Sequence, residues 1–199
     1  YGDLIKQEVQ RFGSYEDLKS QDVTIEEREE YEPWINLGIP IYAGVDYYKI
    51  IKRAEKEAEV IIWDGGNNDL PFYRPDLHIV VMDPHRAGHE LRYHPGEANF
   101  LMADVLVVNK IDTAPKEGIK TVLENIKQYN PKAKVIMAKS KIIVDKSEMI
   151  KNKKVLVVED GPTLTHGEMQ YGAGTVAAKR YGAKIIIDAQ KYATGTIKE

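Results

Sequence analysis

Six short apolar runs recur along the chain, and helical patterns separate several of them. Their apolarity is continuous rather than alternating, which predicts strands buried on both faces. We expect strands at 60–63, 77–82, 105–108, 135–137, 155–158 and 185–187. We expect helices at 47–59, 115–129 and 172–181, with Gly182 ending the last one. This alternation favours an α/β fold with a mostly parallel sheet flanked by helices.

The first forty residues have a different character. They are acidic and helical in propensity, with the run Glu26-Glu27-Arg28-Glu29-Glu30 before Pro33. We therefore expect residues 1–40 to form a helical excursion or lid, and residues 41–199 to form the α/β domain.

Composition narrows the class of protein. The chain has 199 residues, a net charge of −3 and no cysteine, so disulfides and thiolate metal sites are excluded. Apolar runs are too short to span a bilayer, and we expect a cytoplasmic protein without a membrane partner. Residues 110–154 carry 12 lysines without interleaved aromatics, which favours a solvated surface over nucleic-acid binding.

Polar groups follow most of the apolar runs. Ligands of parallel sheets bind at the carboxyl ends of the strands, so these positions are the candidate site. Asn109-Lys110-Ile111-Asp112 follows one run and has the pattern N-K-x-D, which in P-loop GTPases reads the base. The carboxylate of Asp112 would accept donors from the base edge, the stem of Lys110 would lie over its face, and Asn109 would brace the loop. Ser140, in Ala138-Lys139-Ser140, would support the base.

Asp64 follows the first run, ahead of Gly65 and Gly66. A carboxylate there can hold Mg²⁺ beside nucleotide phosphates. The alternative is a glycine-rich tight turn.

A second cluster, residues 83–95, is rich in histidine and arginine. In a helix, His85 and His89 would share a face with Arg92. The two histidines could bind zinc, or Arg86, Arg92 and the imidazoles could grip phosphates. Interleaved arginines repel a cation, so phosphate is favoured; a polar surface loop is the remaining alternative.

A third cluster follows the run 155–158. Glu159 and Asp160 precede Thr163, Thr165 and His166, and a helical stretch comes next. The threonines could cap that helix, or its N-terminus could bind an anion with His166 as donor or proton carrier. No G-x-x-x-x-G-K-[ST] loop occurs in the 199 residues, so nothing in them replaces the loop that cradles nucleotide phosphates.

The chain closely resembles the C-terminal part of archaeal cyclic 2,3-diphosphoglycerate synthetases and their relatives. The matching stretches run nearly end to end and include 1–4, 26–33, 42–47, 63–69, 71–78, 88–93, 109–112 and 158–167. The resemblance implies a P-loop NTPase fold of the signal-recognition, MinD and dethiobiotin-synthetase class, with residues 41–199 as its nucleotide-binding domain. It also implies that a P-loop and an N-terminal domain precede Tyr1.

The same resemblance implies a ligase that closes a phosphoanhydride in 2,3-diphosphoglycerate, or acts on a related phosphorylated small molecule, with release of ADP and phosphate. ATP is then the expected nucleotide, although N-K-x-D favours GTP, and Mg²⁺ would be held by Asp64. Arg74 and His85 would add to the cations that neutralise the substrate. The expected catalytic residues are Asp64, Arg86, His89, Arg92 and His166.

Two other functions stay open. One is a GTPase of the metal-insertion or regulatory type, and the other is a non-catalytic nucleotide-fold module used for binding or assembly. The missing P-loop predicts that the 199 residues alone are inactive. The class leaves room for a homodimer.

Overall fold

The computed structural model describes residues 5–66, 69–159, 172–187 and 189–192. The chain divides into two compact units. The first unit comprises Tyr1–His78 and Leu91–Asn99, and the second comprises Ile79–Glu90 and Phe100–Glu199.

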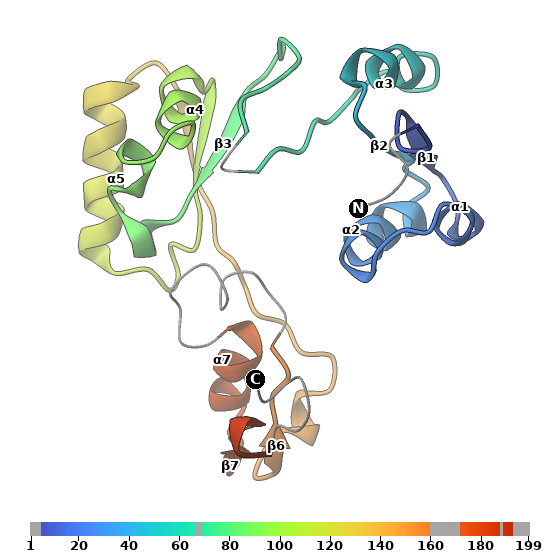
Figure 1. The fold of residues 1–199 in the computed structure, drawn as a ribbon. Coiled ribbons are helices and arrows are strands. Elements are labelled where there is room, and N and C mark those ends of the chain that lie inside the picture. The colour runs from blue at the N-terminus through green and yellow to red at the C-terminus, as the bar shows by residue number, and fades with distance from the viewer. Residues whose placement is uncertain (1–4, 67–68, 160–171, 188, 193–199) are drawn as a thin grey trace. The chain divides into compact units, whose positions relative to one another are not determined.

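The first unit opens with two helices and a small sheet (Figure 1). Strand β1 (Gln10–Phe12) pairs antiparallel with β2 (Ile41–Ala43). Between them lie α1 (Tyr15–Ser20) and α2 (Ile25–Asn36), and α3 (Tyr47–Ala54) follows β2. Each helix begins at a residue whose side chain accepts a hydrogen bond from its first turn, namely Ser14, Thr24 and Asp46. Such caps satisfy backbone donors that have no partner within the helix.

A small core holds these elements together. Phe12, Leu18 and Ile35 are buried side chains from β1, α1 and α2, and Tyr31 and Ile41 pack against them. Phe12 and Tyr31 have ring centroids 5.0 Å apart. Phe12, Leu18 and Ile35 therefore form a small core within the first forty residues, and whether this part acts as a lid stays a prediction.

The second unit is built on a parallel sheet in the order β3-β4-β5. Strands β3 (Ile79–Met82), β4 (Val105–Val108) and β5 (Lys134–Met137) are in register, with Met82 opposite Val108 and Val108 opposite Met137. Helix α4 (Gly96–Met102) precedes β4, and α5 (Lys116–Tyr129) joins β4 to β5. The fully buried side chains here include Phe100, Leu106, Val108 and Val122. The sheet confirms the α/β, mostly parallel architecture.

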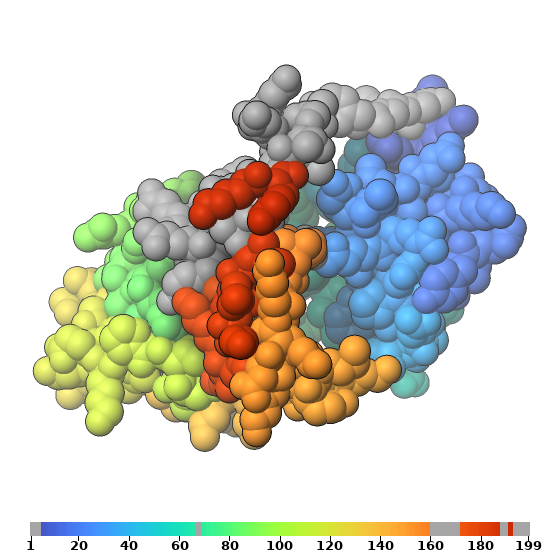
Figure 2. Space-filling view, turned by 90° about the horizontal axis from the view of Figure 1, so that it is seen from below, coloured from blue at the N-terminus to red at the C-terminus, as the bar shows by residue number. Residues whose placement is uncertain are grey.

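A second, two-stranded sheet completes this unit. Strand β6 (Lys154–Leu156) pairs parallel with β7 (Ile185–Ile187), and α7 (Ala173–Arg180) lies between them in the chain. In Figure 2 the orange residues of β6 lie beside the red residues of α7. Gly182 follows α7 at φ +75°, which confirms it as the helix stop because glycine adopts that conformation freely.

Short 3₁₀ turns complete the described elements. They are η1 (Pro84–Arg86), η2 (His89–Leu91), η3 (Ser147–Met149) and η4 (Ala189–Tyr192). No helix among the described residues is long and apolar enough to cross a membrane.

Two expectations from the apolar runs were wrong. Residues 60–63 form no strand, and Ile62 is 82% exposed. Burial on both faces holds for β4 but not for β5, where Val135, Ile136 and Met137 are 38–43% exposed. A continuous apolar run reports the capacity to be buried, whereas burial of a strand on both faces requires other elements packed on each face of the sheet.

Candidate nucleotide site

The carboxyl ends of the three parallel strands form one edge of the larger sheet. The hydrogen-bond ladder runs past the strands into the following loops. Asn109 N donates to the carbonyl of Met82 at 3.0 Å, and Ile111 N donates to the carbonyl of Ala138 at 3.1 Å. The loops after β3, β4 and β5 are therefore tied together where such sheets bind ligands.

The N-K-x-D loop is fixed by its own hydrogen bonds. Asn109 Oδ1 accepts from Lys110 N at 2.8 Å, which is the bracing role predicted for the asparagine. The carbonyl of Lys110 accepts from Thr113 N at 3.0 Å and from Ala114 N at 2.9 Å. Lys110 itself has φ +55°, a left-handed conformation that is uncommon for a lysine. The surrounding bonds hold it there, and strain of this kind concentrates at functional sites.

Asp112 and Ser140, two residues expected to bind the base, are in contact. Ser140 N donates to Asp112 Oδ1 at 3.3 Å, so the loop after β5 orients the carboxylate. Among the described residues no hydrogen bond reaches the second oxygen, Oδ2, and Asp112 is exposed. A carboxylate held on one side and open on the other is suited to accept donors from a base edge.

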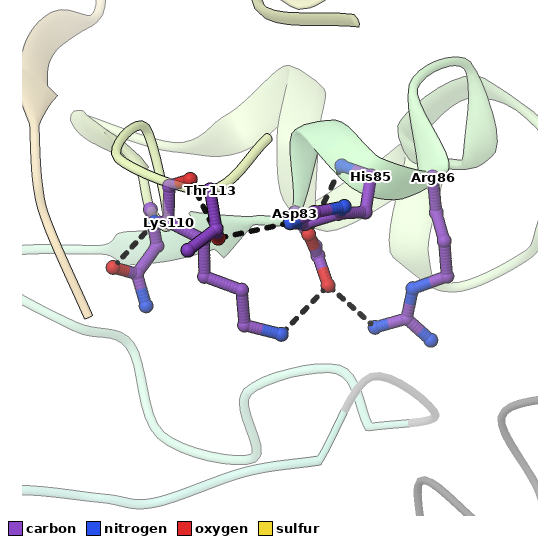
Figure 3. Close-up of polar contacts among 6 residues, drawn as sticks. Asp83, His85, Arg86, Lys110 and Thr113 are labelled. Atoms are coloured by element: carbon purple, nitrogen blue, oxygen red, sulfur yellow. Dashed lines mark hydrogen bonds and ion pairs between the residues drawn. The ribbon is translucent and has the colours of Figure 1, made fainter. Parts of the chain in front are cut away.

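Asp83, the residue after β3, is the centre of the polar network in Figure 3. Its Oδ2 lies 2.8 Å from Lys110 Nζ and 3.4 Å from an Arg86 guanidinium nitrogen. Its Oδ1 accepts from His85 N at 3.1 Å. The side chain is only 14% exposed. Burial alone would raise the pKa of Asp83, but the hydrogen bond from Lys110, the amide of His85 and the two positive charges outweigh it and lower the pKa.

The turn η1 is held against the N-K-x-D loop and against α5. His85 Nε2 lies 3.0 Å from Thr113 Oγ1. On the other side Gly118 of α5 comes so close that an added Cβ would lie 2.2 Å from the carbonyl oxygen of Pro84. Only a residue without a Cβ permits this approach. The contact places the exposed side chains of His85 and Arg86 beside the strand ends.

The segment that holds His85 and His89 is not one helix, so the condition for a helix face shared with Arg92 is not met. The two histidines lie in two separate turns, η1 and η2, and Gly88 between them has φ +92°. Such a residue interrupts a right-handed helix, so helical spacing does not apply. Glu90 secures the bend, because its carboxylate accepts from Gly88 N at 2.8 Å and from Asn125 Nδ2 at 2.7 Å. Among the described residues no three His, Asp or Glu side chains gather in a way that could hold a metal ion.

The predicted site residues fall in different parts of the chain. Arg86, His89, Asn109, Lys110, Asp112 and Ser140 belong to the second unit, whereas Asp64, Arg74 and Arg92 belong to the first. Asp64 is exposed in the loop after residues 60–63. A Cβ at Gly65 would meet the ring of Trp63 at 2.6 Å, so a larger residue there would displace that ring. His166 lies outside the described residues.

The N-terminus of α7 is already occupied by a carboxylate of the chain. Glu159 Oε1 accepts from Gly172 N at 3.2 Å and from Thr175 N at 2.7 Å, and Oε2 accepts from Gly174 N at 3.1 Å. Burial would raise the pKa of Glu159, but these bonds outweigh it and lower the pKa. Sequence reasoning considered Thr163 and Thr165 as caps, which lie outside the described residues. In this structure the helix terminus binds Glu159.

Two site residues were missed by sequence reasoning. Asp83 directly follows the expected strand 77–82 but was given no role, and Thr113 was not considered. Asp83 could have been found because it follows an apolar run directly, as Asn109 does. Thr113 carries no such signal.

Comparison with known proteins agrees with a nucleotide-binding fold. Residues 56–137 match the family model described as "CobW/HypB/UreG, nucleotide-binding domain". The chain is 65% identical over all 199 residues to arginine synthetase ArcE of Thermococcus kodakarensis, and covers 44% of it. It is 28% identical over 88 residues to cyclic 2,3-diphosphoglycerate synthetase of Thermococcus sibiricus, a match that covers 44% of this chain and 20% of the relative. No solved structure matches the chain.

The chain therefore spans less than half the length of both curated relatives. A P-loop-GTPase-like nucleotide-binding fragment related to synthetases is supported. The resemblance to cyclic 2,3-diphosphoglycerate synthetases is confirmed only as a distant one, at 28% identity. The identity of 65% is to a synthetase named for a different product, arginine.

Proposed function

We propose that the full protein containing this chain is a nucleotide-dependent synthetase, and that its second unit binds the nucleotide base. The observation that carries this proposal is Asp112, oriented by Ser140 N and open on Oδ2 at the carboxyl edge of a parallel sheet. The stem of Lys110 and the carboxylate of Asp112 then define the base pocket. We take ATP as the nucleotide that activates the substrate, and GTP is the alternative that the N-K-x-D pattern favours.

We propose arginine as the product, in place of the cyclic diphosphoglycerate expected from the sequence. The support is 65% identity along the whole chain to a protein named arginine synthetase. Arginine ends in a guanidinium group, and its oxygen analogue is the ureido group of citrulline. Replacing that oxygen by nitrogen requires it to leave. Transfer of the terminal phosphoryl group of ATP to the ureido oxygen gives ADP and an activated carbon; attack by ammonia then forms the C–N bond and releases phosphate.

The residues of this chain would act in that chemistry mainly by positioning and charge neutralisation. Arg86 lies beside the strand ends with its side chain 44% exposed, where it can approach an anionic group. Asp64 is of the ligand type that Mg²⁺ accepts, because this ion usually takes one or two carboxylates together with phosphates and water. His89, Arg92 and His166 remain proposals for substrate contact.

A GTPase of the metal-insertion or regulatory type is the second candidate. The match of residues 56–137 to the CobW/HypB/UreG description favours it, as does the N-K-x-D pattern. A guanine edge offers Asp112 two donors where adenine offers one amino group, so base preference separates the candidates.

The test is phosphate release by the purified full-length protein from ATP and from GTP. Each nucleotide is supplied alone, with L-citrulline and an ammonium salt, or with 2,3-diphosphoglycerate, and arginine is assayed separately. We expect release from ATP that depends on citrulline and ammonium and equals the arginine formed. Dependence on 2,3-diphosphoglycerate would replace the product with the cyclic anhydride, and release from GTP that ignores both substrates would establish the GTPase.

A substitution links this activity to the second unit. We expect Asp112→Ala to raise the KM for nucleotide about 10- to 100-fold, because one or more charge-assisted hydrogen bonds are lost, with a smaller effect on kcat. Glu124→Ala is the control, since this exposed carboxylate on α5 has only a surface contact with Lys120. An unchanged KM in Asp112→Ala would place the base elsewhere.

A further inference from the structure

We propose that Asp83 is a positioning residue for the nucleotide base: it holds Lys110 so that the stem of the lysine, rather than its charge, meets the ligand. This inference rests on the proposed nucleotide site and adds to it a residue that the N-K-x-D pattern does not contain. Asp83 and Lys110 lie 27 positions apart, at the ends of the neighbouring strands β3 and β4.

Both ends of the Lys110 side chain are tied down. At the backbone, its carbonyl accepts from Thr113 N and Ala114 N, and its φ is +55°. At the far end, Nζ donates to Asp83 Oδ2 at 2.8 Å. The four-carbon stem between these points therefore has little rotamer freedom left, and 36% of the side chain is exposed. A lysine stem fixed in this way forms an apolar strip on which a flat base can lie. Because the stem is already ordered, base binding costs little further side-chain entropy.

Lys110 and Arg86, the two cations that contact Asp83, have different roles. Lys110 makes the shorter contact with Asp83, and Asp83 is nearly buried, so the lysine charge is neutralised within the protein. Arg86 lies farther away, at 3.4 Å, and its side chain is 44% exposed. His85 turns its ring toward Thr113 rather than toward Asp83 (Figure 3). Arg86 is thus the cation of this network that can meet an anionic ligand group.

The same contacts argue against a metal or proton-transfer role for Asp83. One carboxylate oxygen faces two cations and the other accepts a backbone N–H. A cation added there would be repelled by Lys110 and Arg86, and a carboxylate so well solvated by donors is a weak base.

The experiment separates base binding from phosphate binding. In the full-length protein, calorimetry measures Kd for ADP, GDP and pyrophosphate, the last of which lacks a base. We expect Asp83→Asn to weaken ADP binding about tenfold while pyrophosphate binding changes less than twofold. Glu124→Gln, which removes a surface carboxylate with a lysine partner on α5, should change neither. Equal losses for ADP and pyrophosphate would show a merely structural role and overturn the proposal.

Changes at Lys110 provide an independent test, should Asp83→Asn fold poorly. Lys110→Met keeps an unbranched apolar stem without charge and should retain ADP binding within about threefold, whereas Lys110→Ala should lose about tenfold. Adding Asp83→Asn to Lys110→Met should cost nothing further, because the contact it breaks is already absent. Equal losses in Lys110→Met and Lys110→Ala would overturn the proposal. If the wild type binds neither ADP nor GDP more tightly than it binds pyrophosphate, the base site itself is refuted.

Discussion

Gly118 of α5 provides a direct test of how η1 is placed beside the strand ends. Intrinsic helix propensity predicts that Gly118→Ala stabilises α5, by up to about 1 kcal/mol. The structure predicts the opposite. The new Cβ would lie 2.2 Å from the carbonyl oxygen of Pro84 and 3.3 Å from its carbonyl carbon. To restore an ordinary van der Waals contact, the two segments must separate by roughly 1 Å.

The magnitude follows from two opposing effects. Overpacking of this kind typically costs about 1–3 kcal/mol, and the gain in helix propensity offsets up to about 1 of them. We therefore expect a net loss of about 1–2 kcal/mol of unfolding free energy. Because Pro84 directly follows Asp83, a shift of about 1 Å should also lengthen the Asp83–Lys110 contact, and misplacements of this size cost up to about 100-fold in function. We expect ADP affinity to fall at least fivefold.

The assay is urea denaturation followed by far-ultraviolet circular dichroism, together with calorimetric ADP binding. Glu117→Ala is the matched control, since the side chain of Glu117, next to Gly118 in the chain, is itself 82% exposed. It should change stability by less than about 0.5 kcal/mol and leave ADP binding intact. A Gly118→Ala protein that is more stable than the wild type and binds ADP normally would refute the close approach and the positioning argument built on it.

Three further predictions concern other contacts. Asn130 is buried and donates to the carbonyls of Phe100 and Ala103 at 2.9 and 3.0 Å; Asn130→Ala should cost about 2–3 kcal/mol by leaving both carbonyls unpaired, as measured by urea denaturation. The pKa of Glu159 is lowered from its ordinary 4.5, so the carboxylate stabilises α7 fully above about pH 4.5, and this stabilisation is lost as the pH falls through the lowered pKa. Amide hydrogen exchange in α7 should show this loss in the wild type and not in Glu159→Gln. Thr24 accepts from Glu27 N in a capping box, so Thr24→Ala should destabilise α2 by about 1 kcal/mol, seen as faster amide exchange in that helix alone.

The sequence could predict the elements whose signals are local. The helix at 116–129 agrees with the expected 115–129 because Pro115 marks its start and its apolar residues repeat at helical spacing. Strand β4 and the N-K-x-D loop after it were also predicted from a local signal, because an apolar run is followed directly by the polar motif. Asp112 and Ser140 were each expected at the base, but the hydrogen bond between them was not predicted.

Contacts between distant positions were not predictable from the pattern. Glu159 lies 13–16 positions before the α7 amides to which it is hydrogen-bonded. Asp83 and Lys110 lie 27 positions apart in the sequence. Hydrophobic periodicity describes which face of an element is apolar, but it does not say which polar side chains meet once the elements have packed. The pairing of β1 with β2 was missed because each strand has only three residues, too few for alternation to be recognised.

The two indole side chains of this chain have an optical consequence. Trp34 lies on α2 and Trp63 in the loop before Asp64, and both belong to the first unit; the chain has two tryptophans in all. Intrinsic tryptophan emission therefore reports on the surroundings of the first unit, and ligand entering beside Asp83 and Lys110 has no indole in its own unit to quench. Replacing Tyr129 at the end of α5 by tryptophan would give the second unit an emission of its own, with which base binding can be followed.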